Sequence, residues 1–212
     1  CLPLSLWAAA RLSVPAQRNT AAGGIKLHLI WRELAGYVGF AMGYIVYLTF
    51  LSAWMTDQQA PALLISAVWI IMGVALIASP FVWRGVLARH ASGKPLAMIL
   101  TGIAIGSALP LVLPAGGAVV ISAVAFGLCV FMAPGAITSF IRQNLPAESW
   151  AAAMSLFTVV FAIAQTAGPF AAGALGDLTG NIGSSLLAAA AILLTGASVV
   201  AFQKPLPQQD PS

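Results

Sequence analysis

The chain has 212 residues, of which 60% are hydrophobic and only 7% are charged, and its mean hydropathy is +0.97. A soluble domain of this length carries roughly a quarter charged residues, so the composition excludes a water-soluble globular protein and indicates lipid as the solvent. The net charge of +4 does not indicate a nucleic-acid partner, because the 9 basic residues are spread over loops and form no patch.

The chain opens with the apolar stretch CLPLSLWAAARL, which has no basic residue before its apolar part and is therefore no signal peptide. We interpret residues 1–12 as the end of a preceding transmembrane helix, and the chain as a fragment or a truncated gene product. Residues 13–33 are predicted to be a cytoplasmic linker, because Pro, Asn, Thr and a Gly-Gly pair favour a flexible connector. Its second half, IKLHLIWRE, is either an ordinary connector or a short interfacial helix anchored by Trp31.

Six apolar stretches follow, each near the roughly 20 residues that a helix needs to cross a bilayer. Their length and their lack of polar alternation indicate helices rather than barrel strands. The sequence therefore predicts an all-α membrane protein with a six-helix bundle over residues 34–202 and a cytoplasmic tail over 203–212. The predicted spans are 34–55, 62–83, 95–113, 116–141, 150–175 and 182–202.

The charged residues assign the loops to two sides of the membrane. Asp57 and Asp177 are the only charges on one side, in the loops TDQQAP (56–61) and GDLTGN (176–181), which alternate with PAGG (114–117). All basic residues fall on the other side, so the positive-inside rule predicts that both ends of the six-span unit are cytoplasmic. These basic residues are Arg11, Arg18, Lys26, Arg32, Arg84, Arg89, Lys94, Arg142 and Lys204.

The first span contains GYVGFAMGYIVYLTF (36–50), with every tyrosine of the chain. On a helical projection, Tyr37, Phe40, Tyr44 and Tyr47 form one narrow aromatic stripe. Tyr44 and Tyr47 lie mid-span, where a phenolic hydroxyl needs a partner or water, and they either line a polar cavity or belong to an aromatic, lipid-facing surface. An adjacent stripe contains Gly-x-x-x-Gly and is predicted to pack closely against another helix. Its members are Gly36, Gly39 and Gly43.

The fourth and fifth spans contain the remaining polar and helix-bending residues. Pro134, followed by glycine, should kink the fourth span and free a backbone carbonyl that can face a cavity. Gln165 is the only mid-membrane amide of the six spans, and it serves either an interhelical hydrogen bond or direct solute contact. Gly168–Pro169 is a second predicted hinge. Small residues at intervals of four predict a close-packing seam on the fifth span: Ala164, Gly168, Ala172 and Gly176.

Several kinds of chemistry are missing from the spans. Their apolar interior has no ionisable residue, so they contain no self-sufficient proton-coupling group, and Glu33 and Asp57 are interpreted as solvated end residues. His28 and His90 lie in loops without neighbouring ligands, so no metal site is predicted. No phosphate-binding loop occurs, so the chain itself is expected to hydrolyse no nucleotide, and no cofactor is expected. Cys129 is interpreted as a small buried hydrophobe. An enzyme is not expected.

Three stretches resemble the major facilitator superfamily of transporters. The loop GVLARHASGK resembles the second copy of that superfamily's Gly-x-x-x-Asp-Arg-x-Gly-Arg-Arg loop motif; it keeps Gly85, Arg89, Gly93 and Lys94 but lacks the acidic residue. The segment GPFAAGALGDLTG (168–180) resembles the end of the eleventh helix. The first span, with the sequence GYVGFAMGYIVYLTFLSAWM (36–55), resembles the seventh helix of the bacterial YbfB/YjiJ-like subgroup.

This resemblance implies that residues 34–202 are helices seven to twelve of a twelve-helix fold, arranged as two inverted three-helix repeats. It places Tyr44, Tyr47, Thr49 and the Pro134 region beside a solute, and Gln165 near the other half. It also implies a partner, the N-terminal six-helix half, which this sequence does not contain and on which coupling to protons or ions would chiefly depend.

The hypothesis is therefore half of a secondary active transporter for a small organic solute, in a bacterial cytoplasmic (inner) membrane. The alternative is a non-transporting membrane module for assembly or sensing. A channel has no support, since no charged or carbonyl-rich filter is visible.

Overall fold

The computed structural model describes residues 27–113 and 116–207. The predicted helix end at 1–12, most of the predicted linker and residues 208–212 lie outside the described residues. No strand occurs within the two described ranges, and the predicted all-α fold is confirmed. The helices are α2 (Leu27–Asp57), α3 (Ala62–Arg89), α4 (Lys94–Val112), α5 (Gly116–Val130), α6 (Met132–Asn144), the 3-10 helix η1 (Ala147–Ser149), α7 (Trp150–Thr179) and α8 (Ile182–Ala201).

The described residues contain 6 helical stretches that are long and apolar enough to cross a bilayer, as the hydropathy pattern predicts. α5 and α6 together form one of them, Gly117–Asn144. Two boundaries differ most from prediction. α2 begins at Leu27, so residues 27–33 of the predicted linker are helical and continuous with the first span. α3 continues to Arg89, beyond the predicted end at residue 83.

The fourth span is interrupted at Phe131, between α5 and α6, and not at Pro134 itself. The offset has a steric cause. A proline has no N–H, and its ring clashes with the carbonyl four residues earlier, which here belongs to Val130. The helix therefore breaks on the N-terminal side of the proline. At the second predicted hinge, Gly168–Pro169, α7 continues through both residues without a break in its helical assignment.

Prolines inside continuous helices also leave backbone carbonyls without their usual donors. Pro80 lies inside α3 and Pro110 inside α4, so the carbonyls four residues earlier lose an N–H partner. In both cases a serine hydroxyl replaces it. Ser79 Oγ donates to the Leu76 carbonyl at 2.8 Å, and Ser122 Oγ, from α5, donates to the Gly106 carbonyl at 2.5 Å.

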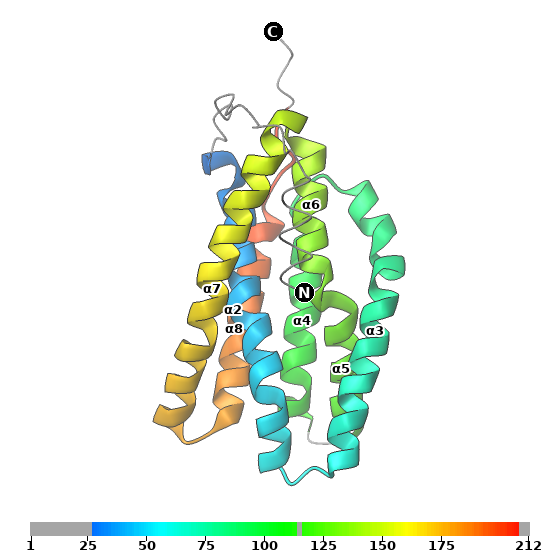
Figure 1. Ribbon diagram of the computed structural model, residues 1–212, viewed down its shortest axis with the longest axis vertical. Helices are drawn as coiled ribbons and strands as arrows, with labels where there is room; N and C mark the ends of the chain where they lie inside the picture. Colours follow the sequence, from blue (N-terminus) through cyan, green and yellow to red (C-terminus); the bar gives the residue numbers. More distant parts are fainter. Residues whose placement is uncertain (1–26, 114–115, 208–212) are drawn as a thin grey trace, which may run out of the picture.

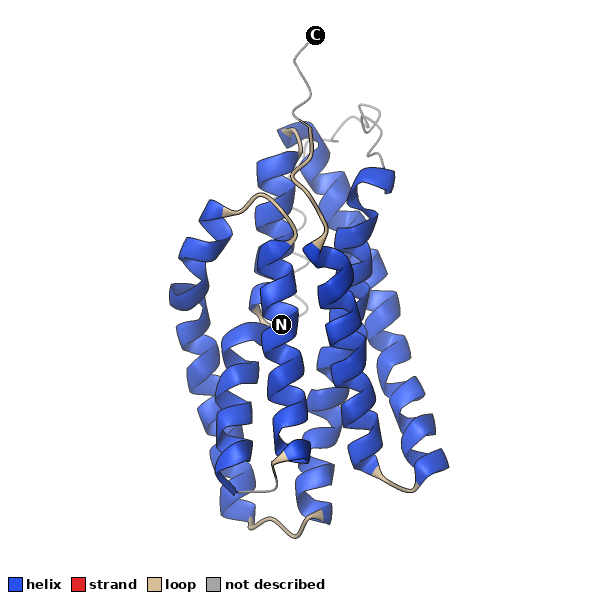
Figure 2. Ribbon diagram, turned by 180° about the vertical axis from the view of Figure 1, so that it is seen from behind, coloured by secondary structure: helices blue, strands red, loops and turns tan. Residues whose placement is uncertain are grey.

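The helices form one bundle in which α7 and α3 lie at opposite edges, as both views show (Figures 1 and 2). α2 packs against α7 and α8, α4 packs against α5 and α8, and α3 packs against α5. These contacts have an internal symmetry. If α2 is exchanged with α5–α6, α3 with α7 and α4 with α8, the same set of contacts results. Each set has three spans, so the second begins on the opposite side of the membrane, and the arrangement is that of two inverted three-helix repeats.

The two ends of the bundle differ in charge. Figure 1 shows the α3–α4 and α6–α7 connections at the same end as the start of α2 and the residues after α8. The α2–α3 and α7–α8 connections, which follow Asp57 and Asp177, lie at the other end. The described basic residues belong to the first end: Arg32, Arg84, Arg89, Lys94, Arg142 and Lys204.

The three glycines of the first span lie against α8. A Cβ at Gly39 would lie 3.3 Å from the Gly196 Cα atom, so the two helix backbones meet directly at this point. A Cβ at Gly36 would lie 2.8 Å from the Val200 side chain, and one at Gly43 would lie 2.5 Å from the Leu193 side chain. Side chains at these positions would separate α2 from α8.

The small residues of α7 face two different helices. A Cβ at Gly168 would lie 2.7 Å from the Met42 carbonyl oxygen of α2, whereas one at Gly176 would lie 3.1 Å from Ser185 Oγ of α8. On the same strip, Ala164 and Ala172 are buried, and the Ala172 carbonyl accepts a hydrogen bond from Ser185 Oγ at 2.6 Å. α7 is thus held at the bundle edge by a strip of small residues, while its opposite face stays exposed.

Candidate functional site

Tyr44 of α2 and Gln165 of α7 form a polar pair across the two helices. The Tyr44 hydroxyl donates to Gln165 Oε1 at 2.6 Å. Both side chains are only partly buried, so the pair is accessible from one side. The pair can form further hydrogen bonds, because the Gln165 amide nitrogen still carries two N–H donors and the Tyr44 oxygen can still accept.

Aromatic rings surround this polar pair. Tyr44 stacks on Phe40 of α2 with ring centroids 4.6 Å apart, and Phe161 of α7 lies 5.9 Å from Tyr44. Tyr37 extends the cluster, with its ring 5.6 Å from Phe40 and 5.3 Å from Phe161. We call Tyr37, Phe40, Tyr44, Phe161 and Gln165 the α2–α7 patch.

Pro169 changes the backbone of the same patch. It lies inside α7 and lacks an N–H, so the Gln165 main-chain carbonyl loses its usual helical donor. The residue that supplies the amide side chain therefore also offers a main-chain acceptor. The sequence contained this signal, since Gln165 and Pro169 are four residues apart.

Tyr47, predicted beside Tyr44, lies in a different place. It is fully buried and stacks on Phe126 of α5 with ring centroids 4.1 Å apart. Its hydroxyl lies 2.6 Å from Ser122 Oγ. Ser122 uses its one hydroxyl proton on the Gly106 carbonyl, so Tyr47 is the donor to Ser122. The structure therefore brings Tyr44 and Gln165 together but places Tyr47 in the core, between α2, α4 and α5.

Thr49 and Pro134 also lie apart from the α2–α7 patch. Thr49 is exposed, about 140° around α2 from Tyr44 at 100° per residue, and its hydroxyl donates to the Ile45 carbonyl of its own helix. Pro134 is partly buried in α6. Helix α6 contacts α3, and Trp83 of α3 donates its indole N–H to the Leu128 carbonyl of α5 at 2.8 Å, next to the break that Pro134 causes.

Trp83 was not among the residues predicted from the sequence. The available signal was a tryptophan near the end of a span, whose N–H needs an acceptor when buried, together with a proline that disrupts carbonyl pairing in another span.

The four residues of the loop motif have unequal environments. Gly93 is tightly enclosed: a Cβ there would meet the Val200 carbonyl oxygen, lie 2.7 Å from Gln203 Cβ and lie 2.9 Å from Glu33 Oε2. A Cβ at Gly85 would meet nothing within 4 Å. Arg89 and Lys94 are exposed at the same end of the bundle.

The interpretation of Glu33 as a solvated end residue is wrong. Its side chain is only 1% exposed, although Asp57 at the other end of α2 is exposed as predicted. The reason is the earlier helix start at Leu27, which places Glu33 inside α2 rather than at its end. The α3–α4 connection at Gly93 then covers it.

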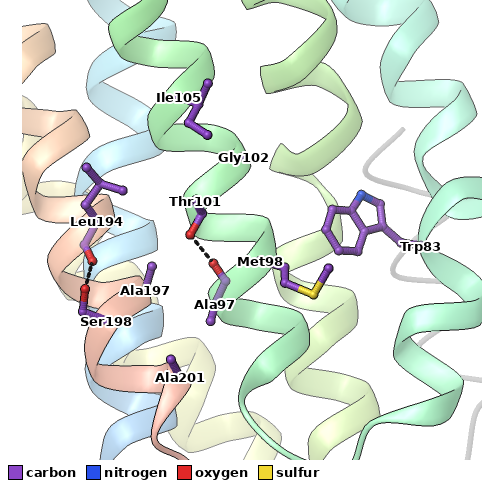
Figure 3. A pocket seen from close by; sticks show the side chains of 10 residues that line it. All are labelled: Trp83, Ala97, Met98, Thr101, Gly102, Ile105, Leu194, Ala197, Ser198 and Ala201. Atoms are coloured by element: carbon purple, nitrogen blue, oxygen red, sulfur yellow. Dashed lines mark hydrogen bonds between the residues drawn. The ribbon is translucent and has the colours of Figure 1, made fainter.

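Apolar grooves lie between the described helices outside the α2–α7 patch. The groove in Figure 3 has a volume of about 560 Å³, and its lining includes Thr101 of α4 and Ser198 of α8. Both hydroxyls donate to carbonyls of their own helices, shown by the dashed lines, which leaves a nearly apolar surface. A second groove of about 360 Å³ runs between α2 and α8, and a third of about 290 Å³ lies between α2, α7 and α8.

Within the described ranges, no group of three or more His, Cys, Asp or Glu side chains could hold a metal ion. The α2–α7 patch consists of neutral hydrogen-bonding groups and aromatic rings. It can hold or pass a molecule by hydrogen bonds and ring contacts, but it offers no nucleophile with an adjacent base.

Fold and patch together define an integral membrane protein of the helical-bundle class, in which a neutral polar pair interrupts an apolar surface. The chain matches the family described as "uncharacterised MFS-type transporter YbfB" over residues 2–201, and it belongs to this family. The sequence resemblance to the major facilitator superfamily and to this branch is thereby confirmed. No curated protein and no solved structure matches the chain.

Proposed function

We propose that this chain is the C-terminal six-helix half of a secondary active transporter that moves a small organic solute by rocking against an N-terminal six-helix half. Membership of a transporter family supports transport as the activity. The observation that carries the proposal is the hydrogen bond of 2.6 Å between Tyr44 and Gln165, a partly exposed polar pair between two membrane helices.

The chemistry of the pair suggests what part of a solute it meets. An uncharged amide and a phenol bind a neutral hydrogen-bonding group well, but neither balances a full charge. The partly exposed rings of Tyr44 and Phe161 favour an apolar or planar part of the same molecule. We therefore propose a solute with a neutral polar group next to an apolar or aromatic one.

We further propose that the basic end of the bundle faces the cytoplasm of a bacterial cell, with the protein in the inner membrane. The positive-inside rule supports this orientation. Reporter fusions test it directly: fusions after Gln58 and after Thr179 should report a periplasmic location, and a fusion after Lys94 a cytoplasmic one. The opposite pattern would reverse the assignment.

Transport by the full-length protein in liposomes tests the function. Under imposed gradients, we expect uptake or efflux of at least one member of a broad panel of small organic solutes. For that solute, Tyr44→Phe and Gln165→Leu should raise the half-saturation concentration about five- to tenfold, because each removes about 1 kcal/mol of hydrogen bonding. Thr195→Val is the matched control, since Thr195 is exposed and its hydroxyl donates only to its own helix.

The outcomes separate transport from a non-transporting module. If no solute of the panel moves under any gradient, the transporter proposal fails. If a solute moves but Tyr44→Phe and Gln165→Leu behave like Thr195→Val, transport stands and the α2–α7 patch is not the solute site. A module for assembly or sensing would tolerate both patch variants and lose function when Gly39 or Gly43 is enlarged.

A further inference from the structure

Glu33 is a buried carboxyl with an unused oxygen. The side chain is 1% exposed, and its Oε2 atom has no hydrogen-bond partner among the described residues. Neither the transport proposal nor the packing of the helices uses this group. A buried carboxylate without partners is costly, so its presence needs an explanation.

Two segments close over Glu33 at the basic end of the bundle. Gly93, in the α3–α4 connection, approaches so closely that a Cβ there would lie 2.9 Å from Glu33 Oε2. Gln203, just after α8, touches the same glycine, and its main-chain carbonyl accepts the Gly93 N–H at 3.0 Å. We call Glu33, Gly93 and Gln203 the clasp.

Gln203 ties the clasp to the first turn of α2. Its side-chain nitrogen donates to the Leu29 carbonyl at 3.0 Å and to the Lys204 carbonyl at 2.9 Å. Its Oε1 atom, like Glu33 Oε2, is buried without a hydrogen-bond partner among the described residues. The clasp thus contains two buried acceptor oxygens that lack donors.

Cationic residues lie on α2, on both sides of the α3–α4 connection and after α8, yet none of the described ones donates to Glu33 Oε2. The Arg32 guanidinium donates to the Phe202 carbonyl instead, and the His90 ring contacts the Val86 carbonyl. The charged and titratable groups at this end of α2, in or next to the α3–α4 connection and after α8 are His28, Arg32, Tyr37, Arg89, His90, Lys94 and Lys204.

The energetics favour a neutral Glu33 under a closed clasp. An unpaired buried carboxylate is strongly disfavoured, whereas a protonated carboxyl carries no charge and supplies an O–H donor. An ionised Glu33 would instead need water, and water can reach it only if Gly93 and Gln203 move away. Closing and protonation should therefore occur together.

We propose that Glu33 is a proton-binding site whose occupancy controls the clasp: the closed clasp holds Glu33 as the neutral acid, and opening releases one proton to the water at the basic end of the bundle. Only the carboxyl O–H bond breaks in this step, and the solvent takes the proton. As part of a transport cycle, which rests on the proposed function, this site would couple proton release to a movement at the cytoplasmic end.

Hydrogen–deuterium exchange of the full-length protein tests the clasp without any transport assay. The probe is the Gly93 amide, whose hydrogen bond to the Gln203 carbonyl exists only in the closed clasp. After correction for the intrinsic pH dependence of exchange, the protection of the peptide containing Gly93 should fall about tenfold per pH unit above a midpoint, because one proton leaves on opening. Glu33→Gln, which mimics the neutral acid, should hold protection at its low-pH level.

Glu148→Gln is the matched control, since Glu148 is an exposed carboxylate at the same end of the bundle, and this variant should retain the pH dependence. A protection at Gly93 that is independent of pH in the unmodified protein, or a pH dependence that survives in Glu33→Gln, would overturn the proposal. Protection that follows sodium concentration at fixed pH would also overturn it, because the buried oxygens would then bind a metal cation.

In liposomes, Glu33→Gln should retain solute exchange at equal concentrations but lose accumulation driven by a pH gradient. Accumulation that persists in this variant would separate the clasp from coupling. If the unmodified protein transports no solute but its protection at Gly93 depends on pH as expected, the proposed function is refuted and the clasp proposal stands.

Discussion

Replacing Ser122 by alanine should destabilise the bundle more than removing the hydroxyl of Tyr47, although both variants break the same hydrogen bond. Tyr47 is fully buried and donates to Ser122 Oγ at 2.6 Å, and Ser122 donates onward to the Gly106 carbonyl at 2.5 Å. The Gly106 carbonyl receives no N–H from its own helix, because the residue four positions later is Pro110.

The magnitudes follow from which groups are left without partners. Tyr47→Phe removes a donor but keeps the ring on Phe126 and the bond from Ser122 to Gly106, so it should cost about 1 kcal/mol. Ser122→Ala leaves both the Tyr47 hydroxyl and the Gly106 carbonyl unpaired in the core, and each such group costs about 1 to 3 kcal/mol. Interhelical hydrogen bonds in membranes average about 0.6 kcal/mol, so we expect a total near the lower limit, about 2 kcal/mol.

Reversible unfolding in mixed detergent micelles measures these differences. The double variant should cost less than the sum of the single variants by about 1 kcal/mol, because the Tyr47→Phe substitution removes the hydroxyl that Ser122→Ala alone leaves without an acceptor. Ser198→Ala is the control, since its hydroxyl is exposed and serves only its own helix. Equal costs for Tyr47→Phe and Ser122→Ala, or strict additivity, would refute the reasoning.

Other substitutions test further parts of the bundle by the same unfolding measurement. Gly39→Leu should cost about 1 to 3 kcal/mol because its side chain would meet the α8 backbone, whereas Gly173→Leu, with nothing within 4 Å, should be neutral; equal effects would contradict the packing of α2 on α8. Pro110→Ala restores an N–H, so Ser122→Ala should cost about 1 kcal/mol less in that background, and an unchanged cost would disprove the role of the proline. Trp83→Phe should cost about 1 kcal/mol through loss of the indole bond to α5; a neutral result would show that this bond does not stabilise the span break.

The spans were predictable because lipid imposes a length and an apolar composition on every helix that crosses it. The same reasoning failed at Glu33. Hydropathy ends a span where the first charged residue occurs, but α2 continues through Glu33 to Leu27, since other segments supply the cover that the sequence window cannot show. A charge at a span end can therefore be exposed, like Asp57, or buried, like Glu33.

The two mid-span tyrosines show a second limit. A helical projection places Tyr44 and Tyr47 on one stripe, and nothing local distinguishes them. Their difference comes from partners far along the chain: Tyr44 meets Gln165 of α7, and Tyr47 meets Ser122 of α5. Only the packing of distant helices decides which tyrosine lies in the core and which lies at an accessible surface.

The chain of hydroxyls from Tyr47 through Ser122 to the Gly106 carbonyl also has a mechanical consequence. It fastens α2, α5 and α4 to one another through buried hydrogen bonds. Neither α2 nor α4 can slide by one turn past α5 unless its hydrogen bond to Ser122 breaks. The edge helices α3 and α7 are the least buried of the 6 spans. Stress applied to the bundle should therefore tilt the edges and leave the fastened centre rigid.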